Sequence, residues 1–421
     1  MTITAWIAVL IVLVTIWALI KRYETRLVLI TSGLVLSMLT LAPMTALDAF
    51  AKSMTNGALI MSICGAMGFA YVISYTRCDE HLVTLLAKPL SKMGILLLPA
   101  CAIVTTVVNT AVSSAAGCAA AVGATMIPLM LKAGIRPAAA AAAVLVGTYG
   151  SMVSPGLSHN AFVAKMAQME IMDLIAHHAN YSILAMVIGI VGFTITAFIM
   201  KDHKGGADTK ANVKENANAI TTANPIYALA PFVPLVLLLA GNTVVPVLKM
   251  GVAQAMVIGA IVALAITRAS PAKMTNEFFN GMGKGYADVI GIIVAAGVFA
   301  AGLKTAGLID VFIETLKHSN DIARWGGSIG PFLMAVITGS GDAAAFAFNE
   351  AVTPHAAHFG MTIPDLGMLA ALAGSLGRTM SPVAGVVIVV SGIAMVSPIE
   401  VVKRTAPAMI VAVITIALVM V

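Results

Sequence analysis

The sequence contains little charge. Only 10% of its 421 residues are Asp, Glu, Lys or Arg, whereas 60% are hydrophobic. A soluble globular domain carries about 25% charged residues, so we expect most of this protein's surface to face lipid. The formal net charge is +6, which on such a chain indicates basic loops beside a membrane. No compact basic patch with interleaved aromatic residues is present, so nucleic acid is not an expected partner.

Cysteine and recognisable catalytic motifs are also scarce. The four cysteines, Cys64, Cys78, Cys101 and Cys118, are far from a CxxC spacing, which predicts buried thiols rather than a disulfide or a metal site. The sequence has no Gly-rich phosphate loop with its lysine and no GxSxG or HExxH motif. We therefore expect no enzymatic activity, no cofactor, no drive by ATP, and no metal other than a coupling ion.

Long uncharged apolar runs are abundant instead. Because a membrane-spanning helix needs about 20 residues, the chain has room for roughly ten to twelve spans. The run from Met93 to Leu131 is nearly twice as long as one span, and its second half is rich in Ser, Thr, Gly and Ala. Small residues permit close helix packing. We predict a span followed by a re-entrant hairpin near residues 105–131; two ordinary spans with a tight turn at about Ser113 are the alternative.

The distribution of basic residues predicts a topology. One polar segment, residues 201–224, separates the first half, 1–200, from the second half, 225–421. Placing this linker and three other basic loops in the cytoplasm obeys the positive-inside rule. Both termini then lie on the outer side, and the two halves start on opposite sides of the membrane. The basic segment 304–324 falls outside in this scheme, against the rule.

The two halves also repeat one another. Ser114 aligns with Ser340 and Gly134 with Gly360, each pair 226 residues apart. The stretch "GTYGSMVSP", residues 147–155, overlies "GSLGRTMSP", residues 374–382, at a spacing of 227. Together with the opposite starting sides, this pattern predicts an inverted-topology duplication, with a second hairpin near 339–359. Secondary transporters built this way bind substrate near the bilayer midplane, between broken helices.

Each of these nonapeptides is predicted to break a helix. Proline lacks a backbone donor, and glycine accepts unusual dihedral angles. Carbonyl groups freed at such a break can bind a cation, and freed N–H groups an anion. A simple proline kink is the alternative.

Arg378 is the one charge inside "GSLGRTMSP". A charge at the membrane centre costs about 2.5–3.5 kcal/mol, so it is usually functional or paired. Since a guanidinium binds a carboxylate through two N–H groups, we predict that Arg378 holds an anionic substrate. An ion pair with Asp342 or Glu350, or a place at a helix end near the headgroups, are the alternatives. The other residues predicted to bind substrate are Thr379, Ser381, Ser375, Ser154, Asn109, Thr110, Ser113 and Ser114. For the last four, packing of helix against helix is the alternative.

Asp342, in "TGSGDAAAF", is the predicted coupling-ion residue. A carboxylate beside Ser hydroxyls and free carbonyls offers oxygen ligands suited to Na⁺, or a group that takes up H⁺. A structural partner for Arg378 and a helix N-cap are the alternatives for Asp342. His159 is interpreted either as a proton relay or as a hydrogen-bonded polar residue at a helix end. The residues predicted around the coupling ion, besides Asp342, are Ser340, Asn349, Glu350, Ser158, His159 and Asn160.

The motif "LGRTMSPVAGVV" followed by "SPIEVVKRT" resembles the C-terminal signature of the anaerobic C4-dicarboxylate carriers of the DcuC type, within the ion-transporter superfamily. The segments "VAAGVFAAGLKTAGLI" and "TGSGDAAAFAF" resemble the same family. The resemblance implies a bacterial inner-membrane carrier for succinate, fumarate or malate. With the topology predicted from the basic loops, both termini are then periplasmic. It also implies a homodimer with a scaffold and a transport domain that moves like an elevator.

Two departures from the family pattern concern charge. This chain reads "GSGD" where "GSGN" is usual, and "SHN" at 158–160 where the family tends to read "SGD". A negative charge has thus moved from one repeat to the other, which leaves the substrate and the coupling ion open.

We therefore predict an all-α polytopic membrane protein with inverted repeats, re-entrant hairpins and broken helices. Its predicted function is secondary active transport of C4-dicarboxylates, coupled to a cation or by exchange. A tricarboxylate, a sugar acid or an amino acid is the alternative substrate. An anion channel and a membrane enzyme are the alternatives from other classes.

Overall fold

The computed structural model describes residues 3–21, 23–92, 96–203, 220, 222–309, 311 and 320–420, and these contain helices and no strands. Seven of the described helices are long and apolar enough to cross a membrane, and a pair of helices bent by 118° is an eighth candidate. Five more apolar helices are 10–17 residues long. The all-α, multi-pass class is confirmed, while a total of ten to twelve spans stays a prediction.

Among the described residues of the first half there are ten α-helices and two short 3₁₀ helices. They are α1 (Ile3–Ile20), α2 (Thr25–Leu39), α3 (Pro43–Met54), α4 (Gly57–Tyr75), α5 (Cys78–Ala87), η1 (Lys88–Lys92), α6 (Leu97–Ala111), α7 (Ala115–Lys132), α8 (Pro137–Gly147), η3 (Gly150–Val153), α9 (Ser158–Ala167) and α10 (Ile171–Ile199).

The second half begins with α12 (Pro225–Leu229), η4 (Ala230–Phe232), α13 (Val233–Thr243), η5 (Pro246–Leu248) and α14 (Val252–Thr267). The π-helix η6 (Gly285–Ile290) joins α15 (Pro271–Lys284) to α16 (Gly291–Thr305). The chain ends with α18 (Asn320–Thr338), α19 (Gly341–Ala351), the 3₁₀ helix η7 (Thr353–Phe359), α20 (Ile363–Thr379), α21 (Gly385–Ala394) and α22 (Pro398–Val419).

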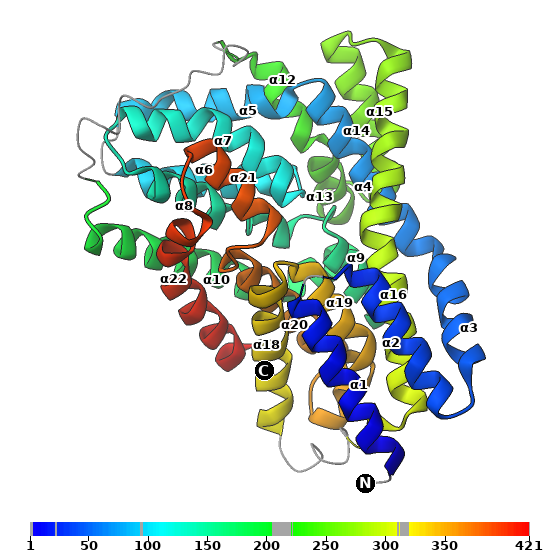
Figure 1. Ribbon diagram of the computed structural model, residues 1–421. Helices are drawn as coiled ribbons and strands as arrows, with labels where there is room; N and C mark the ends of the chain where they lie inside the picture. The colour runs from blue at the N-terminus through cyan, green and yellow to red at the C-terminus, as the bar shows by residue number, and fades with distance from the viewer. Residues whose placement is uncertain are drawn as a thin grey trace.

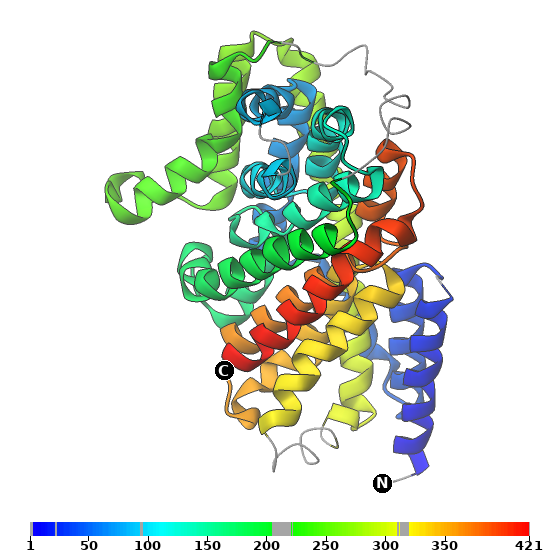
Figure 2. The same ribbon diagram turned by 90° about the vertical axis from the view of Figure 1, so that its left-hand side faces the viewer.

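Helices from the two halves pack against each other throughout the molecule (Figure 1). α2 packs on α16 and α4 on α15, along one side of the protein. Figure 2 shows α10 and α22 running side by side through the middle. Neither half is therefore a separate globule, and the core is shared between them.

Two helical hairpins reach into this core. The first is α6–α7, with Val112, Ser113 and Ser114 at its tip, and the second is α18–α19, with Gly339 and Ser340 at its tip. Ser114 Oγ accepts a hydrogen bond from Gly117 N at 3.2 Å and caps α7, and Ser340 Oγ caps α19 through Ala343 N at 3.1 Å. The hairpins occupy 97–132 and 320–351, so both begin earlier than the sequence indicated, and η7 lies outside the second. Residues 97–131 contain just the two helices of the first hairpin, so the separate span predicted before it is not found there, and the turn lies close to Ser113, where the alternative placed it.

The two nonapeptides differ in where the helix ends. α8 stops at Gly147, as expected, whereas α20 continues through Gly374 and Gly377 to Thr379. The expectation that these two glycines end a half-helix is therefore wrong. Their role is close packing, because a Cβ at Gly374 would lie 2.8 Å from the carbonyl oxygen of Gly341 on hairpin α18–α19.

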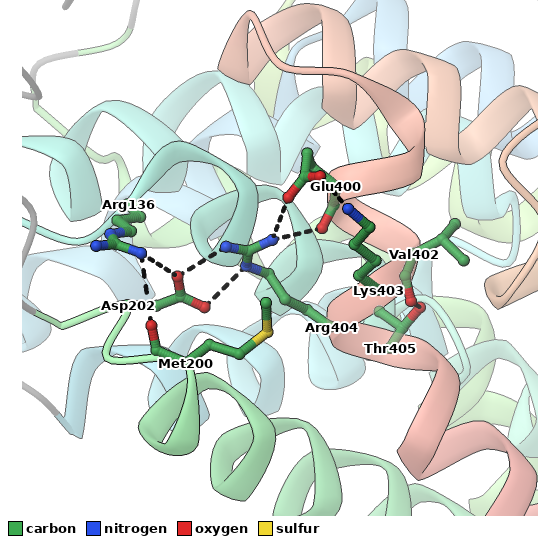
Figure 3. Close-up of polar contacts among 8 residues, drawn as sticks. All are labelled: Arg136, Met200, Asp202, Glu400, Val402, Lys403, Arg404 and Thr405. Atoms are coloured by element: carbon green, nitrogen blue, oxygen red, sulfur yellow. Dashed lines mark hydrogen bonds and ion pairs between the residues drawn. The ribbon is translucent and has the colours of Figure 1, made fainter.

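A buried charge network joins the two halves (Figure 3). Asp202, directly after α10, is fully buried and accepts hydrogen bonds from Nε and Nη2 of Arg404, each at 2.8 Å. Its carbonyl oxygen accepts from Arg136 N at 2.9 Å, where α8 begins. Arg404, on α22, also donates to the Glu400 carboxylate at 3.2 Å. The start of the predicted linker is thus part of the core. Residues 204–219 and 221 lie outside the described residues, as do 310 and 312–319 of the segment 304–324.

Candidate functional site

A cavity of about 240 Å³ lies between the tip of the first hairpin, the start of α19 and the two helix breaks. Apolar side chains of α4, the π-helix and α21 form part of its wall, including Met67, Val289 and Val386. Its polar lining residues are Ser113, Ser114, Ser151, Ser158, His159, Asp342, Ser375 and Arg378. Both halves of the chain therefore contribute polar groups to one cavity.

Arg378 brings a positive charge to this cavity from the last turn of α20. One guanidinium nitrogen, Nη2, donates to the carbonyl oxygen of Thr148 at 3.5 Å. The buried Nε has no hydrogen-bond partner among the described residues. Within the same part of the chain, no carboxylate forms an ion pair with this guanidinium, so the alternatives pairing it with Asp342 or Glu350 are not realised. A guanidinium binds a carboxylate through two parallel N–H groups, so the unused N–H groups of Arg378 are suited to hold one.

Asp342 brings the negative charge and is paired across the two halves. Its Oδ1 lies 3.0 Å from Nε2 of His159, which joins the first turn of α19 to the first turn of α9. The His159 ring is 1% exposed and stacks on Phe346 with ring centroids 4.6 Å apart. The Asp342 side chain is 44% exposed. His159 therefore holds the carboxylate at the cavity wall without covering it.

Serine side chains supply the remaining polar surface. Ser113 Oγ donates to the carbonyl oxygen of Gly156 at 3.2 Å, which fixes the first hairpin tip against the first break. Ser114 caps α7 beside it, and Ser158 begins α9. Ser375 Oγ lies one helical turn before Arg378 and donates to Met152 Sδ at 3.4 Å. Seven of the predicted site residues thus meet here: Ser113, Ser114, Ser158, His159, Asp342, Ser375 and Arg378.

Other predicted residues use their polar groups within the protein rather than at the cavity. The hydroxyl of Thr379 donates to the Ser375 carbonyl oxygen at 3.0 Å, one turn back along α20. Threonine in a helix commonly makes this bond. Thr110 donates to the Gly150 carbonyl oxygen at 3.1 Å, and Asn109 Oδ1 accepts from Ser151 N at 2.7 Å. Thr110 and Asn109 thus attach the first hairpin to the first break. Neither of them lines the cavity, and Thr379 does not line it either.

The two breaks use the same serine turn. Ser154 Oγ accepts from Gly156 N at 3.4 Å, and Ser381 Oγ accepts from Val383 N at 3.4 Å. Both serines are buried. Each turn contains a proline and is stabilised by the serine preceding it, so these two serines shape the breaks and do not line the cavity.

Four residues predicted near the coupling ion also lie away from the cavity wall. Asn160 donates to the carbonyl oxygens of Met152 and Ser154, both at 2.9 Å. Asn349 Nδ2 donates to the Gly367 carbonyl oxygen at 3.1 Å. Ser340 caps α19, and Glu350 lies nearly three helical turns beyond it. The coupling-ion prediction therefore depends on Asp342, His159 and Ser158.

Ser151 is a lining residue that we did not predict. It occupies the position in "GTYGSMVSP" that Arg378 occupies in "GSLGRTMSP". The alignment of the repeats already contained this signal, because equivalent positions of two related breaks can face one shared cavity.

Comparison with known proteins decides the class. A family model described as C4-dicarboxylate anaerobic carrier, DcuC, matches residues 44–421. The chain belongs to this family. It is a family of transporters and not of enzymes, so the DcuC chain described here is a multi-pass membrane transporter.

Individual relatives agree with this family. A putative uncharacterized transporter of Haemophilus influenzae is 54% identical over 279 residues, which cover 64% of this chain and 100% of that one. The anaerobic C4-dicarboxylate transporter DcuC of Escherichia coli K12 is 29% identical over 83% of this chain and 77% of its own. A probable DcuC of Vibrio cholerae is 29% identical over 94% and 93% of the two chains. The solved structure of Neisseria gonorrhoeae MtrF shares the fold, with a TM-score of 0.63 at 14% identity over 89% of this chain and 83% of that one.

Proposed function

We propose that this protein is a secondary active transporter that carries C4-dicarboxylates such as succinate, fumarate and malate across the bacterial inner membrane. The observation that carries the proposal is the Arg378 guanidinium, which lines the cavity and whose buried Nε has no hydrogen-bond partner in the described chain. The family, and relatives named for C4-dicarboxylates, support the substrate class.

The cavity offers a place for each carboxylate of such a substrate. Arg378 binds one carboxylate through its free N–H groups. The second carboxylate lies at the tip of the first hairpin, where Ser113 and Ser114 precede the N-terminus of α7. The positive end of the helix dipole and the serine hydroxyls favour an anion there. Ser375 and Ser151 line the space between the two ends.

Asp342 is the proposed site of the coupling cation, H⁺ or Na⁺. A dicarboxylate dianion brings two negative charges into a cavity whose wall already carries Asp342 against the single charge of Arg378. Unbalanced charge in a poorly hydrated space is unfavourable, so a cation at Asp342 makes binding of the dianion easier. Ser158 and His159 are the nearest residues of the predicted set.

We further propose that the two halves are inverted repeats that move a shared transport domain in a homodimer, with both termini periplasmic. The helix bounds support the duplication. α9 begins at Ser158, and α21 begins at Gly385, the counterpart of Ser158 in the second repeat. Each helix is followed by a residue with left-handed backbone angles, Gln168 after α9 and Met395 after α21. α10 and α22 then begin at the same spacing of 227 residues, at Ile171 and Pro398. The elevator motion and the dimer follow from the family resemblance.

Exchange in proteoliposomes tests the proposal. Vesicles containing the purified chain and preloaded with unlabelled succinate should accumulate labelled succinate, and fumarate or malate should compete. A tricarboxylate, a sugar acid or an unrelated amino acid that competes better would change the substrate class. Current through the protein without counterflow would indicate an anion channel, and the proposal would be wrong.

A further inference from the structure

A second hollow, of about 500 Å³, is a groove on the surface between α10 and α22. α10 lines it from Val187 to Ile199, and α22 lines it from Pro407 to Val411. The one polar lining side chain is Thr196, whose hydroxyl donates to a carbonyl oxygen of its own helix at 2.8 Å. Because α10 is a candidate membrane span, we expect this exposed apolar groove to face lipid chains.

The groove has the length of one leaflet of a bilayer. From Val187 to Ile199 the helix rises by about 18 Å, at about 1.5 Å per residue. The hydrocarbon core of a bilayer is about 30 Å thick, so one leaflet is about 15 Å deep. The two helices touch at the floor of the groove, because a Cβ placed on Gly192 would lie 2.9 Å from Cβ of Ala408. The groove thus has room for one extended acyl chain.

α10 and α22 run antiparallel, so the end of one helix lies beside the start of the other. A Cβ on Gly189 would lie 3.3 Å from Cε of Met409. Asp202, just after the end of α10, binds Arg404 near the start of α22. The groove therefore leads from the middle of both helices to this junction.

Three exposed basic side chains lie at the junction (Figure 3). Lys403 precedes the lining residue Pro407 by one helical turn and so lies on the same face of α22. Arg136 Nη1 donates to the carbonyl oxygen of Met200, directly after the last lining residue of α10, at 3.5 Å. Lys201 follows and forms no ion pair within the described parts of the chain. The apolar groove therefore ends at a basic surface.

The charge at this end of the groove is positive on balance. Its two carboxylates, Asp202 and Glu400, are both bound by Arg404. Four basic side chains against two carboxylates leave two positive charges in excess: Arg136, Lys201, Lys403 and Arg404. Nε and Nη2 of Arg136 have no acceptor among the residues that the structure describes. The opposite end of α10 instead carries exposed acidic residues, Glu170 and Asp173.

We propose that the groove binds one anionic phospholipid, with an acyl chain between α10 and α22 and the headgroup phosphate at Arg136, Lys201 and Lys403. A guanidinium with unused N–H groups binds phosphate oxygens directly. Basic pockets between membrane helices are suited to anionic headgroups, most of all at the cytoplasmic side, where the positive-inside rule places this end of α10. No residue lines both this groove and the candidate substrate cavity, so the lipid site is independent of the proposed substrate.

Thermal unfolding and native mass spectrometry of the purified, full-length chain in detergent test this inference. Phosphatidylglycerol should raise the unfolding midpoint and stay bound in the mass spectrum, because a ligand of the folded state stabilises that state. Phosphatidylethanolamine with the same acyl chains should bind about tenfold more weakly or worse, since each basic group beside an anionic headgroup contributes about fivefold.

Two results with the natural chain would overturn the proposal. Equal binding of the two lipids would show that the headgroup charge is not recognised. An equal rise of the midpoint with inorganic phosphate alone would show that the basic surface binds free anions and that the groove takes no part. Both comparisons are informative even where a variant folds poorly.

Removing the basic end tests the headgroup position. Arg136→Gln combined with Lys201→Gln should abolish the preference for phosphatidylglycerol. Arg268→Gln combined with Lys273→Gln is the matched control, because it removes the same charge from exposed residues around the start of α15. The control should keep the preference. An equal loss in both double variants would mean that net charge, and not this site, attracts the lipid, and the proposal would be wrong.

Filling the groove tests the position of the acyl chain. Val411→Trp should weaken binding of phosphatidylglycerol about tenfold while the basic end stays intact. Leu418→Trp is the control, since Leu418 lies on the same helix, is 54% exposed like Val411, and does not line the groove. Unchanged lipid binding by the Val411→Trp protein would contradict the proposed site.

Discussion

Gly150 and Gly377 occupy equivalent positions in the two repeats, and each packs directly on the backbone of the neighbouring hairpin. A Cβ on Gly150 would collide with the carbonyl group of Thr106 in α6, and a Cβ on Gly377 with the carbonyl group of Phe332 in α18. The same small residue thus seats a hairpin on a helix break twice, although the helix ends at one break and continues at the other.

Replacing Gly377 by alanine should loosen the second hairpin. Overpacking against backbone costs about 1–3 kcal/mol, because the carbonyl cannot move without displacing α18. Thermal unfolding in detergent should show a lower midpoint, and succinate exchange should fall. Gly392→Ala is the matched control, since a Cβ there meets nothing within 4 Å and alanine favours a helix by about 0.5–1 kcal/mol. A Gly377→Ala protein as stable as the control would contradict this account of the contact.

Arg378→Ala should abolish saturable succinate exchange, because the cavity would lose its positive charge while Asp342 remained. Arg378→Lys keeps the charge but not the two-pronged donor geometry, so we expect partial activity with weaker apparent affinity. Thermal midpoints with and without succinate report binding separately from transport. Normal exchange by the alanine variant would exclude Arg378 as the carboxylate ligand.

His159→Ala should release Asp342 from its position. The lost hydrogen bond to a charged group is worth about 1.5–3 kcal/mol, and a cavity would form beside Phe346. We expect lower stability and a changed dependence of uptake on the coupling cation. His159→Gln retains an N–H donor and should recover part of both properties. If the alanine and glutamine variants behave alike, the bond to Asp342 is not what matters at this position.

The buried pair of Asp202 and Arg404 predicts an asymmetric double-mutant cycle. Arg404→Met should cost about 3–5 kcal/mol, because the fully buried Asp202 carboxylate loses both hydrogen bonds from the guanidinium. Asp202→Leu should cost less, because Arg404 keeps its contact with Glu400. The double variant replaces the pair with apolar groups and should be far closer to the natural stability. Thermal unfolding of the three variants measures this coupling. Additive losses would show that the two charges do not stabilise each other.

The sequence allowed the class and much of the site to be predicted, for physical reasons that individual residues show. Low charge and long apolar runs required a membrane protein, and proline near glycine located both helix breaks. Ser114 and Ser340 could be aligned as equivalents, and both cap a hairpin helix. Arg378 was identifiable because a single charge in an apolar stretch is energetically costly, and such a charge is usually functional or paired.

The remaining site depended on information that is not local. His159 and Asp342 are 183 residues apart, and only tertiary packing brings them together. Thr379 and Ser375 are both small hydroxyl residues on α20 and lie four residues apart, on one face of the helix. Only Ser375 lines the cavity, and the Thr379 hydroxyl donates back to the Ser375 carbonyl oxygen, which the sequence does not reveal. The end of α20 was misplaced because the contact of Gly374 with the second hairpin cannot be distinguished in sequence from a helix-ending glycine.

The bond between Asp202 and Arg404 also limits how the protein can move. Sliding α22 along α10 would separate the Arg404 guanidinium from the Asp202 carboxylate in the interior, and moving α8 away would break the hydrogen bond from Arg136 N to the Asp202 carbonyl oxygen. We therefore expect these three helices, drawn from both halves of the chain, to move as one rigid unit. Any rearrangement that exposes the substrate to the opposite side has to take place along other surfaces.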